Sequence, residues 1–158
     1  MKRIALTGAV LLGSLLSFNL ATAADLSPEE QAAQTVSTRQ AVFKLLSFSN
    51  APLGIMARGQ TPFDADAANE ALDRIATLGH MIPAVFESDT TGVSGLTTRA
   101  ADTIWASKAD FDQLAADLVA GAEEAKNILS AQGEAGLRAA VAAVGPKCGA
   151  CHDRFRLD

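Results

Sequence analysis

The chain has 158 residues, of which 49% are hydrophobic and 20% charged, and its formal net charge is −5 at pH 7. A negative charge of this size argues against binding to nucleic acid or to an anionic membrane surface. The chain has only two cysteines, no tyrosine and few β-branched runs, so we expect one helical domain without a stabilising disulfide.

Residues 1–23 have the pattern of a cleaved signal peptide. Lys2 and Arg3 give a positive start, a largely apolar stretch follows, and Ala21-Thr22-Ala23 offers the small residues of a cleavage site. An uncleaved membrane anchor is the alternative, although glycine, serine and asparagine interrupt the apolar stretch. Removal of this segment leaves a domain of residues 24–158, with 11 lysines and arginines against 18 acidic residues, a formal charge of −7.

The first predicted helix begins at Pro28 and runs to about residue 50. Ser27 can cap it, and Glu30 completes a capping box. Pro52 should kink or interrupt this helix, leaving one further turn before Gly59. The apolar residues of this helix are Val36, Val42, Phe43, Leu45, Leu46 and Phe48. They form a face too wide for a single partner, which suggests that the helix contacts a further surface besides the core.

A second helix is expected over residues 65–86, with Asp64 as its cap. Apolar residues recur in it at spacings of three and four, the period of one buried helical face: Leu72, Ile75, Leu78, Ile82 and Val85. Residues 88–106 contain glycines and several threonines and should form a long crossover, with a short helical turn around residues 99–105.

Two more helices follow the crossover. The third should begin after Ser107, a weaker capping signal, and run to about residue 131 before Gly133 breaks it. Its inward residues are predicted to be Phe111, Leu114, Leu118, Ala122, Ala125 and Leu129. The fourth should start near Glu134 and pass Pro146, which would kink it. Four helices of this length predict an all-α fold, an antiparallel four-helix bundle.

The fourth helix ends in Cys148-Gly149-Ala150-Cys151-His152, which has the spacing of a c-type haem attachment site. On a helix, Cys148 and His152 share a face and Cys151 lies about 100° round from His152, so one segment presents both thiols and the imidazole to a planar ligand. A thioredoxin-like redox pair would need a βαβ context, and a structural zinc site would need a second pair of ligands, and the sequence shows neither. A bare disulfide and a metal site therefore remain only as minor alternatives. We predict one covalent haem c per chain, which agrees with export because bacteria attach this haem outside the cytoplasm.

Three stretches together resemble the cytochromes c′, a family of four-helix bundles with the haem motif at the C-terminus: Arg39-Gln40-Ala41-Val42-Phe43, Trp105 ahead of Phe111, and Cys148 to Arg156. The resemblance covers essentially residues 24–158. It implies that His152 is the only protein ligand of a five-coordinate, high-spin haem iron, and that Phe43 covers the open sixth position. A phenyl ring neither binds iron nor donates a hydrogen bond, so this site should disfavour dioxygen and water while admitting nitric oxide and carbon monoxide.

The same resemblance suggests roles for four more residues. Arg39 would reach a haem propionate, with Gln40 as a weaker candidate, and the alternative for Arg39 is a solvated surface charge. Arg156, four residues after His152, would lie beside the proximal imidazole, or else be a frayed charge at the C-terminus. Trp105 would line the edge of the haem pocket, with plain core packing as the alternative.

These residues predict a periplasmic protein that binds gases and also transfers electrons to a periplasmic redox partner. A low-spin, six-coordinate electron-transfer cytochrome of the same fold is the alternative, and it would need Met56, Met81 or His80 as a second iron ligand. An enzyme is not expected, because Phe43 offers no acid–base group for peroxidase chemistry. The broad apolar face of the first helix, with part of the second, should pair two chains as a homodimer.

Overall fold

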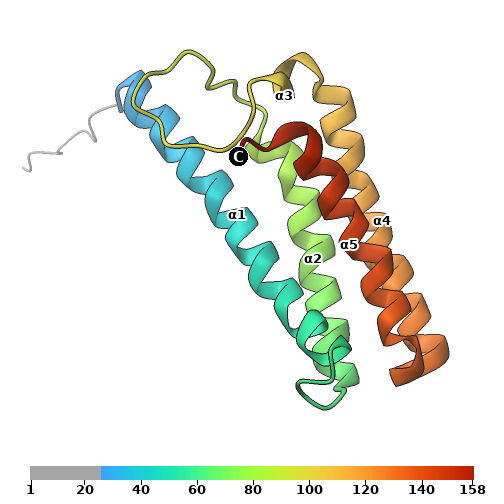
Figure 1. Cartoon of the computed structure of the whole chain (residues 1–158). Helices are drawn as coiled ribbons and strands as arrows, with labels where there is room; N and C mark the ends of the chain where they lie inside the picture. The colour runs from blue at the N-terminus through green and yellow to red at the C-terminus, as the bar shows by residue number, and fades with distance from the viewer. Residues whose placement is uncertain (1–25) are drawn as a thin grey trace, which may run out of the picture.

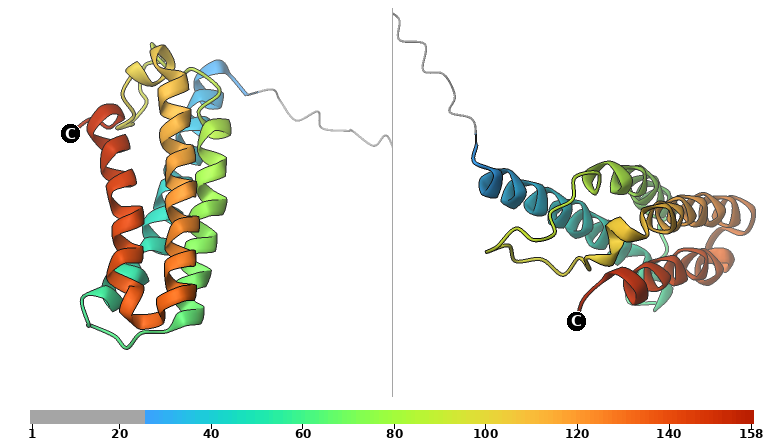
Figure 2. Two further views of the ribbon diagram at one scale, coloured as in Figure 1. Left: turned by 90° about the vertical axis from the view of Figure 1, so that its right-hand side faces the viewer. Right: turned by 90° about the horizontal axis from the view of Figure 1, so that it is seen from above.

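The computed structural model describes residues 26–158, so the expected signal peptide lies outside the described residues and stays a prediction. Four long helices run antiparallel and side by side along one axis (Figures 1 and 2), which confirms the predicted all-α four-helix bundle. They are α1 (Pro28–Ala57), α2 (Ala65–Val85), α4 (Lys108–Gln132) and α5 (Leu137–Phe155); two short elements, α3 (Thr103–Ala106) and the 3₁₀ helix η1 (Gly133–Gly136), lie between them in sequence.

Helix α1 begins as predicted and ends later than predicted. The Ser27 hydroxyl accepts from the Glu30 amide at 3.2 Å, and the Glu30 carboxylate accepts from the Ser27 amide at 2.8 Å, which completes the capping box. The predicted interruption at Pro52 was wrong, because the helix continues to Ala57. Pro52 removes the donor for the carbonyl of Phe48, and since Phe48 is exposed, water can take the place of that donor.

The other helices follow their sequence signals with two differences. Asp64 caps α2 by accepting from the Ala67 amide at 3.0 Å. Ser107, in contrast, makes no capping bond to α4, so that part of the prediction was wrong. Gly133 ends α4 with φ +56°, and a 3₁₀ turn then precedes α5, which therefore starts at Leu137 rather than near residue 134. Pro146 does not interrupt α5.

The predicted inward faces of α2 and α4 form most of the core. The buried members of those predicted faces are Leu72, Ile75, Leu78, Ile82, Phe111, Leu118, Ala122, Ala125 and Leu129, whereas Val85 and Leu114 are half-buried at its edge. Helix α4 lies very close to α5 at Gly121, where an added Cβ would come within 2.7 Å of the carbonyl oxygen of Ala143. Glycine is required there by the close contact of the two backbones.

The contact between helices α1 and α5 is much less extensive than the contacts of α1 with α2, of α2 with α4 and of α4 with α5. Figure 1 shows α1 leaning away from α5 towards the end of the bundle where the crossover and the C-terminus lie. The apolar face of α1 is accordingly divided between core and solvent: Val42 is buried, whereas Leu45 and Phe48 are 50% and 67% exposed. Within residues 26–158, no helix combines the length and the apolar character that crossing a membrane requires.

Candidate haem-binding site

A cavity of about 520 Å³ lies between α1 and α5, and residues of α2, α4 and the crossover complete its walls. Its lining is mostly apolar. Cys148, Cys151 and His152 all face it from α5, so the structure brings the three residues of the attachment motif to one wall. Of the other predicted site residues, Arg39, Gln40, Phe43 and Arg156 also line the cavity, whereas Trp105 does not.

The two thiols suit a covalent bond to a flat apolar group. Both cysteines are half-buried and neither takes part in a disulfide. Burial raises the pKa of the Cys148 thiol, and burial together with the neighbouring Cys148 raises the pKa of Cys151. Since most of the surrounding wall is apolar, the chemistry of this donor set matches a haem held by two thioethers.

His152 lies on the last full turn of α5 and is exposed. Desolvation of the imidazole lowers the pKa of His152, and the nearby positive charges of Arg156 and Arg99 lower it further. A lowered pKa favours the neutral imidazole, which is the form that binds a metal ion. The wall formed by α5 therefore offers one nitrogen ligand next to two attachment points.

Phe43 lines the cavity from α1, which lies on the other side of the cavity from α5. The cavity-lining residues of α1, α2 and α4 include no histidine, methionine or cysteine. Met56 is instead buried in the core, where its Sδ accepts from the Asp64 amide at 3.4 Å, and Met81 and His80 are exposed on α2 outside the cavity. The described residues thus place a phenyl ring, and no second iron ligand, across from His152.

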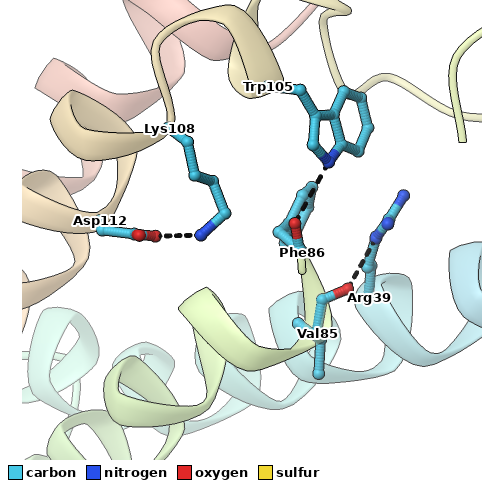
Figure 3. A network of polar contacts seen from close by, with 6 residues as sticks. All are labelled: Arg39, Val85, Phe86, Trp105, Lys108 and Asp112. Atoms are coloured by element: carbon cyan, nitrogen blue, oxygen red, sulfur yellow. Dashed lines mark hydrogen bonds and ion pairs between the residues drawn. The ribbon is translucent and has the colours of Figure 1, made fainter. Parts of the chain in front are cut away.

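Arg39 is buried, with only 3% of its surface exposed, and is not the solvated charge that the sequence left possible. Its Nε donates to the carbonyl of Val85 at 2.8 Å and its Nη1 to the hydroxyl of Thr90 at 2.8 Å, and Nη2 donates to the carbonyl of Ser88. Figure 3 shows the Nε contact and the indole of Trp105 nearby. Burial lowers the pKa of Arg39. Three of its five N–H groups therefore hold the last residue of α2 and the beginning of the crossover, a role that sequence reasoning missed.

Trp105 packs one layer behind the cavity wall. Its Nε1 donates to the carbonyl of Phe86 at 3.2 Å, as Figure 3 shows, and the Arg39 guanidinium lies 5.1 Å from its ring centroid. In the same view Lys108 pairs with Asp112 at 2.6 Å. The position of Trp105 agrees with the packing alternative rather than with a place at the pocket edge.

A row of four phenylalanines connects the two sides of the site. Phe43 meets Phe86 with 6.0 Å between ring centroids, Phe86 meets Phe111 at 4.9 Å, and Phe111 meets Phe155 at 5.4 Å. The row starts on α1 at the residue opposite His152 and ends on α5, three residues after His152. These aromatic contacts fix the distance between the two walls.

Two polar contacts close the top of the cavity. Gln40 donates from Nε2 to the carbonyl of Thr97 at 2.8 Å, which ties the crossover to α1. The tail after α5 pairs with the crossover, since Ala100 and Arg156 form an antiparallel bridge. Arg156 is therefore not frayed. Arg99, which sequence reasoning did not single out, also lines the cavity.

Comparison with known proteins identifies relatives over most of the chain. The sequence profile of the family described as Cytochrome C' matches residues 34–156. Cytochrome c′ of Rhodopseudomonas palustris is 35% identical over 121 residues, which cover 77% of this chain and 80% of that protein. A crystal structure described as cytochrome c′ from the same organism has a TM-score of 0.72 at 33% identity, covering 78% of this chain and 96% of that one. A nitric oxide complex of the L16I mutant of cytochrome c′ from Alcaligenes xylosoxidans has a TM-score of 0.68 at 27% identity, covering 80% and 97%.

Proposed function

Because the chain belongs to the cytochrome c′ family, whose members bind haem c, we propose that it is a periplasmic protein that binds nitric oxide and carbon monoxide at a five-coordinate, high-spin haem iron. Cys148 and Cys151 would hold the haem and His152 would be its only protein ligand. When bound, the haem supplies an iron that can take one small gas molecule as a further ligand.

One observation carries this proposal, which is the composition of the wall across from His152. Among the cavity-lining residues of α1, α2 and α4, none has an imidazole, thioether or thiol. Since these described residues offer no such group, we expect a ligand on the α1 side to be a small molecule from solution. The nitric oxide complex of a relative with the same fold supports the choice of gas.

Phe43 would select among small ligands. Its ring is held against Phe86, 6.0 Å away between centroids, and this contact keeps an apolar surface over the site. Water and bound dioxygen are stabilised by hydrogen-bond donors, which a phenyl ring lacks. Nitric oxide and carbon monoxide depend less on such donors, so we expect them to be favoured. The same absence of a proton donor and acceptor argues against peroxidase catalysis.

Electron transfer to a periplasmic redox partner is the second role that we propose. The last turn of α5 is exposed at His152 and Arg156, so the haem would lie close to the surface at that end of the bundle. A homodimer is proposed as well, because Leu45 and Phe48 remain exposed on α1 beside a groove that Leu78 of α2 also lines.

The test is the absorption and resonance Raman spectrum of the purified ferrous protein, before and after nitric oxide and then carbon monoxide are added. A five-coordinate, high-spin spectrum that changes with both gases is expected. A six-coordinate, low-spin spectrum that ignores both gases would overturn the proposal. Phe43→Met serves as a positional control, since a thioether at this place should convert the spectrum to low spin if residue 43 lies over the iron.

A further inference from the structure

The last residues of the chain are tied down. The Leu157 amide donates to the carbonyl of Arg99 at 2.8 Å, and the Ala101 amide donates to the carbonyl of Phe155 at 3.0 Å. The side chain of Arg99 adds a third bond, from Nε to the carbonyl of Leu157 at 3.0 Å. We call this pairing the tail clamp (residues 99–101 and 155–157).

The tail clamp connects both sides of the cavity. Its crossover strand follows Thr97, whose carbonyl accepts from Gln40 of α1. Its tail strand follows directly on the turn that carries His152, because the Arg156 amide donates back to the His152 carbonyl at 3.1 Å. The turn around His152 is therefore fastened through the crossover to the helix that carries Phe43.

Arg99 contributes the one side-chain bond that we describe in the clamp, and its donor is charged. Arg99 and Arg156 both line the cavity, and neither forms an ion pair within the described residues. Arg99 is thus placed to act through the clamp on the turn that carries His152.

We propose that Arg99 is a positioning residue for the iron ligand: by holding the C-terminal tail against the crossover, it fixes the orientation of His152 and keeps Arg156 beside it. This inference rests on the proposed function, because it takes His152 as the ligand of a five-coordinate iron. The residue that this inference adds, Arg99, lies 53 positions before His152 in the sequence. None of its hydrogen bonds given above involves Cys148 or Cys151.

Two substitutions loosen the clamp in different ways. Arg99→Gln removes the side-chain bond and one charge. Leu157→Pro removes the amide that donates to Arg99 but keeps every charge, and Arg156 before it already has the extended backbone (φ −114°, ψ 128°) that a following proline favours. Leu157 is 52% exposed, so its side chain is not needed for packing. Arg138→Gln is the matched charge control, since Arg138 is exposed on α5 and lies 14 residues, about 21 Å along the helix, from His152.

The measurements are made on the full haem-loaded protein, with far-ultraviolet circular dichroism to confirm that each variant keeps its helices. Hydrogen exchange at the Ala101 amide reports the clamp and should become about tenfold faster in both clamp variants. The iron–histidine stretching band of the ferrous Raman spectrum reports the ligand and should broaden or shift in both, while Arg138→Gln leaves both readouts unchanged.

Two results would overturn the proposal. An unchanged iron–histidine band in spite of faster exchange would mean that the clamp orders the tail alone. A band that changes in Arg99→Gln but not in Leu157→Pro would assign the effect to charge rather than to positioning. Failure of the proposed function would be seen separately, as a six-coordinate, low-spin spectrum of the unaltered protein.

Discussion

Replacement of Arg39 should destabilise the protein strongly, because the guanidinium is buried and joins α1 to the end of α2 and to the crossover through three hydrogen bonds. Arg39→Lys retains the charge but replaces a planar fork by one nitrogen, so about two of the three bonds are lost. At the low end of about 1.5 kcal/mol for each charge-assisted bond, the free energy of unfolding should fall by about 3 kcal/mol. Arg39→Ala also loses stacking on Phe86, 4.6 Å away, and should cost about 5 kcal/mol.

The assay is guanidinium chloride unfolding of the haem-loaded protein followed by circular dichroism, with Arg138→Lys as the exposed control that should stay within about 0.5 kcal/mol of the parent. Whole domains are stable by only about 5–15 kcal/mol, so the expected losses are easily measured. A loss below about 1 kcal/mol in Arg39→Ala, together with a changed haem reduction potential, would refute this reasoning. It would return Arg39 to the role first expected from the sequence, as a partner of a haem propionate.

Three further substitutions test other parts of the structure. Phe43→His should raise peroxidase turnover at least about tenfold by adding an acid–base group, and high turnover in the unaltered protein would contradict our view of the site. Phe48→Glu should convert a dimer into monomers in sedimentation at micromolar concentration, and a parent protein that is monomeric under those conditions would remove the dimer. Gly121→Ala should lower the free energy of unfolding by about 1–3 kcal/mol, because its Cβ would meet the backbone of Ala143, whereas Gly54→Ala, whose Cβ meets only the flexible Arg58 side chain, should not.

Local sequence signals were enough to predict the four long helices and to recognise the motif at the end of the last helix. Capping residues and apolar periodicity act within a few positions, so Ser27, Asp64 and the inward face of α4 could be predicted. Pro52 misled the prediction because the cost of a proline depends on whether the freed carbonyl can reach water, and this depends on the tertiary structure.

Sequence reasoning could group the candidate site residues that share one helix, but it missed contacts between segments that are distant in the sequence. Cys148 and His152 share a helical face, and the structure places both on one wall of the cavity. The partners of Arg39, in contrast, lie 46 to 51 residues away, at the last residue of α2 and in the crossover that follows it. The contact of Arg99 with the tail spans 58 residues. Periodicity carries no information about such pairings, so neither role could be seen before the fold was known.

Trp105, which packs behind the cavity wall, also provides an intrinsic fluorescence signal for unfolding. The chain has one tryptophan and no tyrosine, and the indole of Trp105 lies 6.4 Å from the ring of Phe86, which itself lines the cavity. A haem bound in this cavity would take up the excitation energy of the indole behind its wall, so the folded protein should be nearly dark in ultraviolet fluorescence. Since the haem stays covalently attached after denaturation, emission that appears on unfolding measures the separation of α3 from α5, without any added label.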